Sequence, residues 1–206
     1  MVAVSEVAIA NSCFRKIGVK QKIGTFDEGT AAANFANDRY RELRDDLLRS
    51  HNWNFAIKRA KLAKLSTGPT SPSDWNYFQL PADWIRTVGI FDNDAGISSG
   101  FEHFHEDDKK ISAGREELWI TYVYGVEDPN AMTPDFREAL AYAMAVEGAI
   151  DLVGSRTLSE TMEARFDRKV NQAKGADSMT DGPRFLPRGS WVSQRVRSSS
   201  NSITTS

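Results

Sequence analysis

Two histidines followed by three carboxylates form the pattern in this chain that comes closest to a metal site. His103 and His105 stand two residues apart and precede Glu106, Asp107 and Asp108. On a strand, side chains two apart point to the same face, so both imidazoles could reach one ion. A structural zinc site needs four ligands and a catalytic one three, and the chain's third histidine stands far away in sequence. The pattern therefore favours an exposed polar strand edge, and we assign no metal ligand.

Paired carboxylates raise the question of acid and base catalysis. They occur at Asp45-Asp46, Asp107-Asp108 and Glu116-Glu117. Glycoside hydrolysis needs two carboxylates facing each other across a cleft, one of them desolvated so that its pKa rises. Adjacent residues on a helix point about 100° apart and do not converge in this way. No nucleophile elbow, phosphate-binding glycine loop or His-Glu-x-x-His motif is present. We expect no enzyme, catalytic residue or cofactor; the alternative is a carboxylate-based hydrolase of surface polysaccharide.

Length and composition fit a globular protein with a real core. The chain has 206 residues, of which 40% are hydrophobic and 26% charged. A formal net charge of −2 gives no general attraction to nucleic acid or to an anionic membrane. No apolar run approaches the roughly 20 residues of a membrane helix, and no signal peptide is visible. Cys13, the single cysteine, falls in an apolar helical pattern, where we expect a small buried hydrophobe. We expect a soluble protein made in a cytoplasm, with no membrane partner.

Hydrophobic periodicity predicts helices over residues 5–17, 27–50, 133–154 and 157–176. Gly18 suits the left-handed cap at the end of the first helix. Thr25–Glu28 and Thr157–Glu160 both have capping-box spacing and therefore predict helix starts. Thr133 can cap the third helix, and the proline that follows it suits the first helical position. The alanines of this third helix would let a neighbouring helix approach closely.

Runs of aromatic and β-branched residues predict strands over 77–80, 84–91, 101–105 and 118–124. Residues 92–96 and 112–114 have turn composition. The predicted class is α+β: a bundle of about four helices with an inserted small antiparallel β-sheet and an extended C-terminal arm. Residues 1–54 and 131–178 would form the helical body, 55–130 the β-rich insertion and 179–206 the tail. Trp53 and Phe55 are expected in the core, where they would lock the long helix to the sheet.

The C-terminal stretch from Gly182 to Ser206 contains arginine and aromatic residues but no acidic residue. Its candidate interface residues are Arg184, Phe185, Arg188, Trp191 and Arg195. We hypothesise that this arm lies on a neighbouring subunit or another partner, with Phe185 and Trp191 as anchors. The alternatives are a tail without contacts, and contacts between the arginines and DNA phosphates.

Four stretches in a fixed order carry a resemblance to a known family. They are YRELRDDLLRSHNWNFA (Tyr40–Ala56, followed by Lys58-Arg59-Ala60 and Leu62), FQLPADWIR (Phe78–Arg86), WITYVY (Trp119–Tyr124, shortly before Asp128-Pro129) and PDFREALAYAMA (Pro134–Ala145). With these stretches the chain resembles the tail tubular protein A family of short-tailed, podovirus-type bacteriophages, the head-to-tail adaptor proteins. The resemblance extends over about Ala8 to Ala176. It departs at Asn52, where the family commonly has proline, and after Met179.

This resemblance implies a structural connector with no catalytic residues. Its partners would be its own copies in a ring, commonly of twelve in relatives, the portal protein, the tail nozzle protein (tubular protein B-like), and genomic DNA passing transiently through the lumen. The location would be the head–tail junction of the virion, assembled in the host bacterial cytoplasm. We expect the helices to form the ring body and the portal-facing surface, and the sheet to project toward the tail. A strongly basic lumen would retain the genome, so its lining should be polar or acidic. Net charge and the lack of a basic helix disfavour a free-standing DNA-binding factor.

Overall fold

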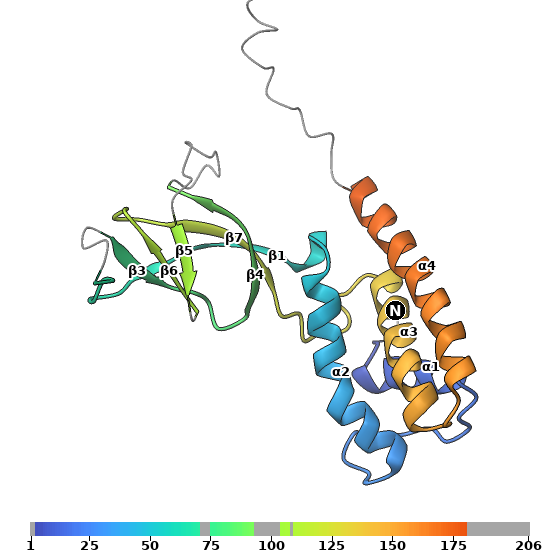
Figure 1. Cartoon of the computed structure of the whole chain (residues 1–206). Coiled ribbons are helices and arrows are strands. Elements are labelled where there is room, and N and C mark those ends of the chain that lie inside the picture. The colour runs from blue at the N-terminus through green and yellow to red at the C-terminus, as the bar shows by residue number, and fades with distance from the viewer. Residues whose placement is uncertain (1–2, 71–74, 93–103, 108, 181–206) are drawn as a thin grey trace, which may run out of the picture.

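The computed structural model describes residues 3–70, 75–92, 104–107 and 109–180 as an α+β protein, and the predicted class is confirmed. In chain order the elements are α1 (Glu6–Lys16), α2 (Ala31–Arg49), the 3-10 turn η1 (Asn54–Ala56), β1 (Ile57–Lys61), β2 (Ala63–Lys64), β3 (Asn76–Gln79), β4 (Trp84–Phe91), β5 (Phe104–Asp107), β6 (Lys110–Ala113), β7 (Trp119–Tyr124), α3 (Pro134–Asp151) and α4 (Arg156–Thr180). The strands lie on one side of α2, and the other three helices lie on its opposite side (Figure 1). All strands come between α2 and α3 in the sequence, so the β-region is an insertion into a helical body. No helix in the described ranges is both long and apolar enough to cross a membrane.

Helices α1 and α3 begin and end where their capping residues predict. The Ser5 hydroxyl accepts a hydrogen bond from the N–H of Ala8 at the start of α1. At its end Gly18 takes a φ of +80°, and the Val19 N–H donates to the Phe14 carbonyl at 2.9 Å. This is the glycine-dependent helix end that the sequence predicts. Thr133 caps α3 as expected, with proline at the first helical position.

The predicted start of α2 at Asp27 is wrong, because the capping-box residues form a separate turn. The Glu28 carboxylate accepts from the backbone N–H of Thr25 at 3.0 Å, as a capping box would. Gly29 follows with a φ of +68°, a left-handed conformation that interrupts the helix. Thr30 is the true cap, and its hydroxyl accepts a backbone N–H from the first turn at 3.2 Å.

Helix α4 also differs from the prediction at both ends. Its cap is Ser155, whose hydroxyl accepts from the N–H of Leu158 at 3.3 Å, and not Thr157. The helix continues past Ala176 to Thr180. These extra residues matter because they include the one that fixes α4 to the end of α2.

The strands form two antiparallel sheets where the sequence predicted one. The first sheet has the strand order β1-β7-β4 and the second β2-β3-β6-β5. Buried side chains from both sheets share a core: Leu62, Phe78, Leu80, Ile90, Ile111, Ala113, Leu118, Ile120 and Tyr122. The chain passes from the first sheet to the second at Leu62, whose N–H donates to the Leu118 carbonyl at 2.8 Å. The insertion is therefore a small two-layer unit with its own hydrophobic core.

Three strands have sequences that lack a strand pattern, and the sequence does not predict them. β1 and β2 are rich in lysine and arginine, and the end of β6 overlaps residues 112–114, whose composition predicts a turn. In the structure Ser112 is buried, and its hydroxyl donates to the carbonyl of His105 on the neighbouring strand. Pairing with neighbouring strands, rather than intrinsic propensity, holds these short segments in the sheet.

Helix α3 is the centre of the helical body, and its small residues let other helices approach. A Cβ atom on Gly148 would lie 3.2 Å from side-chain atoms of both Ile17 and Phe35. The expected close approach at the alanine-rich helix is thus confirmed on the faces that meet α1 and α2. Cys13 is buried in the same core, and burial raises the pKa of its thiol to about 12, as suits a small hydrophobe.

Trp53 is fully buried, but it locks α2 to α3 rather than to the sheet. Its indole N–H donates to the Leu47 carbonyl at 2.9 Å, close to the end of α2. Its ring meets Phe136 of α3 edge-to-face, with centroids 5.1 Å apart. Phe55 packs on the same Phe136 at 5.0 Å. The core prediction for Trp53 is confirmed, and its expected partner is corrected.

We expect Trp53→Phe to lower the free energy of unfolding by about 2 kcal/mol, because it removes a buried hydrogen bond and leaves a small cavity. Urea denaturation followed by circular dichroism measures this loss. Trp119→Phe is the matched control, since Trp119 is only partly buried on β7 and should lose less than about 1 kcal/mol. Equal losses in the two variants would show that Trp53 has no special role in the core.

Candidate functional site

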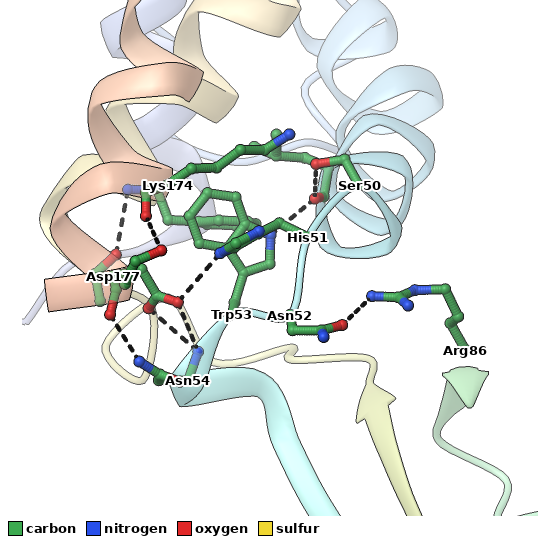
Figure 2. Close-up of polar contacts among 12 residues, drawn as sticks. Ser50, His51, Asn52, Trp53, Asn54, Arg86, Lys174 and Asp177 are labelled. Carbon is green, nitrogen blue, oxygen red and sulfur yellow. Dashed lines mark hydrogen bonds and ion pairs between the residues drawn. The ribbon is translucent and has the colours of Figure 1, made fainter. Parts of the chain in front are cut away.

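The segment that follows α2 is tied to the last turns of α4 by a reciprocal pair of residues. Figure 2 shows His51 and Asn54 of this segment facing Asp177 of α4. The Asp177 carboxylate accepts the backbone N–H of Asn54, with oxygen distances of 3.2 and 3.1 Å. In return the Asn54 side-chain amide donates to the Asp177 carbonyl at 2.8 Å. These bonds join residues far apart in sequence, and we call them the Asn54–Asp177 junction.

The junction gives a buried carboxylate the partners that it needs. Asp177 has a side-chain exposure of only 5%, and the Nε2 atom of His51 lies 3.6 Å from one of its oxygens. The His51 ring also meets the Trp53 indole edge-to-face at 5.0 Å. An unpaired buried carboxylate would cost several kcal/mol, so these contacts are a condition for α4 to reach this position.

Asn52, where the resemblance departs from the family pattern, has a structural role of its own. Its side-chain oxygen accepts a hydrogen bond from the guanidinium of Arg86 on β4, which Figure 2 also shows. A proline at this position has no side-chain oxygen to accept that bond. Asn52 therefore links the end of α2 to the first sheet, while its neighbour Asn54 links it to α4.

Next to the junction, an apolar groove of about 370 Å³ runs between α2 and α4. Its floor is made by Leu43 and Leu47 of α2, Ala143 of α3, and Phe166 and Val170 of α4. The two helices that form its walls both pack on α3, which leaves the space between them open to solvent. We call this feature the α2–α4 groove.

The rim of the α2–α4 groove is polar, and its described residues carry two carboxylates and one ammonium group. Asp46 stands on the α2 side and Asp167 on the α4 side, and both are exposed. Ser50 and Lys174 lie at the end nearest the junction. An apolar floor with a charged rim is the usual anatomy of a protein-binding surface.

A second, larger cavity lies on α2 and is polar. It has a volume of about 620 Å³, and its lining includes Glu6, Asp38, Glu42 and Asp45. Tyr40 also lines it, with a buried hydroxyl that has no hydrogen-bond partner among the described residues. Burial, and then the charge of Glu6, raise the pKa of this hydroxyl. This cavity gives one face of α2 an acidic character, with Arg41 as the one cation of its described lining.

Three of the paired carboxylates that the sequence singled out form ion pairs with cations. Glu116 and Glu117 form ion pairs with Lys64 and Lys61, each at 2.6 Å. The Lys64 ammonium lowers the pKa of Glu116, whereas a general acid needs a raised pKa. Asp45 accepts from the Arg44 guanidinium at 2.8 Å.

The remaining sequence-predicted sites are only partly described. His105 lies on β5, where its ring stacks on Trp75 with centroids 5.4 Å apart, whereas His103 and Asp108 lie outside the described residues. Within the ranges that the structure covers, no three His, Cys, Asp or Glu side chains group as metal ligands would. The five interface candidates also lie outside the described residues and stay predictions: Arg184, Phe185, Arg188, Trp191 and Arg195.

Comparison with known proteins adds no assignment. No family model matches the sequence, and no curated protein matches it.

A double-mutant cycle tests the Asn54–Asp177 junction. We expect Asp177→Ala and Asn54→Ala each to lower the free energy of unfolding by about 1–3 kcal/mol, because each leaves buried polar groups without a partner. The double variant should lose close to the sum of the two, because each side chain bonds to the backbone of the other residue and the two side chains do not bond to each other. Chemical denaturation gives all four values. Glu163→Ala, an exposed change on the same helix, is the control, and losses at the junction no larger than that of the control would contradict the assignment.

Proposed function

We propose that this chain is a head-to-tail adaptor of a short-tailed bacteriophage virion. Copies of it would form a ring that joins the portal to the tail nozzle and lines the channel for the genome. The observation that carries the proposal is the origin of the α2–α4 groove. Leu43, Leu47 and Ser50 come from the stretch Tyr40–Ala56, and Ala143 comes from Pro134–Ala145. Two of the four stretches that carry the family resemblance therefore meet at one open apolar surface.

The chemistry of the α2–α4 groove favours a protein partner over a small polar substrate. Its floor is aliphatic and aromatic, and its charged groups stand on the rim. Enzyme sites instead place a few polar groups inside a pocket, aimed at the reacting atoms. A groove between two helices suits an inserted helix or extended segment, in which apolar anchors give affinity and rim charges give orientation.

The arrangement of the two parts also supports a connector. In a ring, one surface of each copy meets a different surface of the next, so the helical body needs more than one contact face. The groove lies on the helical body, whereas the two sheets lie on the other side of α2 (Figure 1). Sheet loops can therefore meet one partner while the helices meet another. The acidic cavity on α2 agrees with a channel that must not retain DNA.

Binding of the full-length chain to the portal ring of the same phage tests this function directly. Negative-stain microscopy and light scattering should show a ring of the chain on the portal. Leu43→Asp should weaken this binding about tenfold or more, because it places a charge on the apolar floor of the groove. Asp167→Lys, an exposed rim change that spares the core, should weaken it as well.

Ile150→Asp is the matched control, since Ile150 is 54% exposed on α3 and does not line the groove. It should bind the portal like the wild type, and circular dichroism should show that all three variants are folded. If the wild-type chain does not bind a portal ring, the adaptor function is wrong. If it binds and both groove variants bind equally well, the adaptor function stands but the groove is not the contact surface.

A further inference from the structure

The α2–α4 groove lies close to the point where the described chain ends. Lys174, at the junction end of the groove, is about 9 Å from the end of α4 by helical rise. Residues 181–206 follow directly from that end. The Asn54–Asp177 junction holds the last turns of α4 against the segment after α2, so this starting point is fixed relative to the groove.

The composition of residues 181–206 matches the groove. Phe185, Leu186 and Trp191 provide apolar side chains for an aliphatic and aromatic floor. From Gly182 onward the segment has four arginines and no acidic residue, whereas the described lining of the groove carries Asp46 and Asp167 on opposite walls and a single lysine, Lys174, at the end nearest the junction. The segment is thus complementary to the groove both in its apolar side chains and in the sign of its charge.

The chain is also long enough to return along its own helix. The distance along α4 from Thr180 back to Phe166 is about 21 Å at the helical rise. An extended chain advances about 3.3 Å per residue, so about seven residues cover that distance. Gly182-Pro183 has the composition of a turn at the required place. Phe185 can then reach the near end of the groove and Trp191 its far end.

We propose that the C-terminal segment, residues 181–206, folds back along α4 of its own chain and occupies the α2–α4 groove. A tethered segment of this length has an effective concentration in the millimolar range, far above that of a second copy in dilute solution. The chain's own segment therefore outcompetes another copy's. The docking requires only the groove and the segment and does not depend on the adaptor function. Its consequence for assembly rests on the proposed function: the segment must leave the groove before an assembly partner can bind there.

Disulfide cross-linking of the full-length chain tests the docking. In the variant Asn171→Cys with Pro187→Cys, one cysteine stands on the groove wall and the other two residues after Phe185, at the same distance from the end of α4. Mild oxidation should give an intramolecular disulfide, seen as faster migration on a non-reducing gel. Cys13 stays out of the reaction because it is buried and its thiol pKa is raised to about 12.

The control pairs Pro187→Cys with Asp38→Cys, and Asp38 lines the polar cavity of α2. The intramolecular disulfide of the control pair should form at least about tenfold more slowly than that of the test pair. Adding Phe185→Ser and Trp191→Ser to the test pair should slow cross-linking by a similar factor. Equal rates for the test and control pairs would overturn the proposal, and so would a linked dimer as the main product of the test pair.

Portal binding by the cross-linked chain separates this inference from the proposed function. The oxidised test variant should bind the portal ring about tenfold more weakly than the same variant after reduction. Portal binding without intramolecular cross-linking would show that the adaptor function is right and the docking wrong. Intramolecular cross-linking without portal binding by the reduced chain would show that the docking is right and the adaptor function wrong.

Discussion

The buried indole of Trp53 is the contact on which the arrangement of the molecule depends. The chain leaves α2 at this residue and must turn from a helix into the first strand. The indole N–H satisfies the Leu47 carbonyl near the end of α2, and the ring is held against Phe136 of α3. Because the ring is fully buried, the following residues have little freedom of direction. Asn54 is thereby presented to Asp177, and β1 starts three residues later. The placement of the sheets and of the end of α4 both follow from this one buried side chain.

The α2–α4 groove lies along the C-terminal half of α2, between two clamps that hold α2 to its neighbours. At the middle turn of α2, Arg39 donates to Glu147 of α3 through two nitrogens, one of them at 2.7 Å, and this hydrogen bonding raises the pKa of the guanidinium. Beyond the C-terminal end of α2, the Asn54–Asp177 junction holds α4. Between these clamps α2 and α4 each rest on α3 through their apolar stripes. Both stripes are wider than α3 alone can cover, so part of each remains open as the floor of the groove.

The sequence predicts the helices well because their signals are local, and it fails where an outcome depends on distant contacts. Thr133 and Gly18 act within one turn of their own position, and both were predicted correctly. The Glu28 turn has the same local pattern as a helix cap, and only the conformation of Gly29 separates the two. Asp177 is one of several acids in a polar helix, and nothing in its neighbourhood marks it as the partner of Asn54. The apolar groove residues were expected as core, because periodicity identifies an apolar stripe without telling how much of it is covered.

An open apolar groove on a free subunit is a hazard, and a tethered cover is a simple physical remedy. Exposed apolar surface promotes unspecific association, most of all when many copies are made together before assembly. A tethered segment need not bind tightly to prevent this. With an intrinsic dissociation constant of about 1 mM and an effective concentration of about 10 mM, it would cover the groove about 90% of the time. A true partner would then bind about tenfold more weakly than to an open groove, a cost of about 1.4 kcal/mol. A multivalent ring contact offsets that cost easily, whereas a single unspecific encounter does not. The same weak cover would therefore suppress aggregation and still permit assembly on a portal.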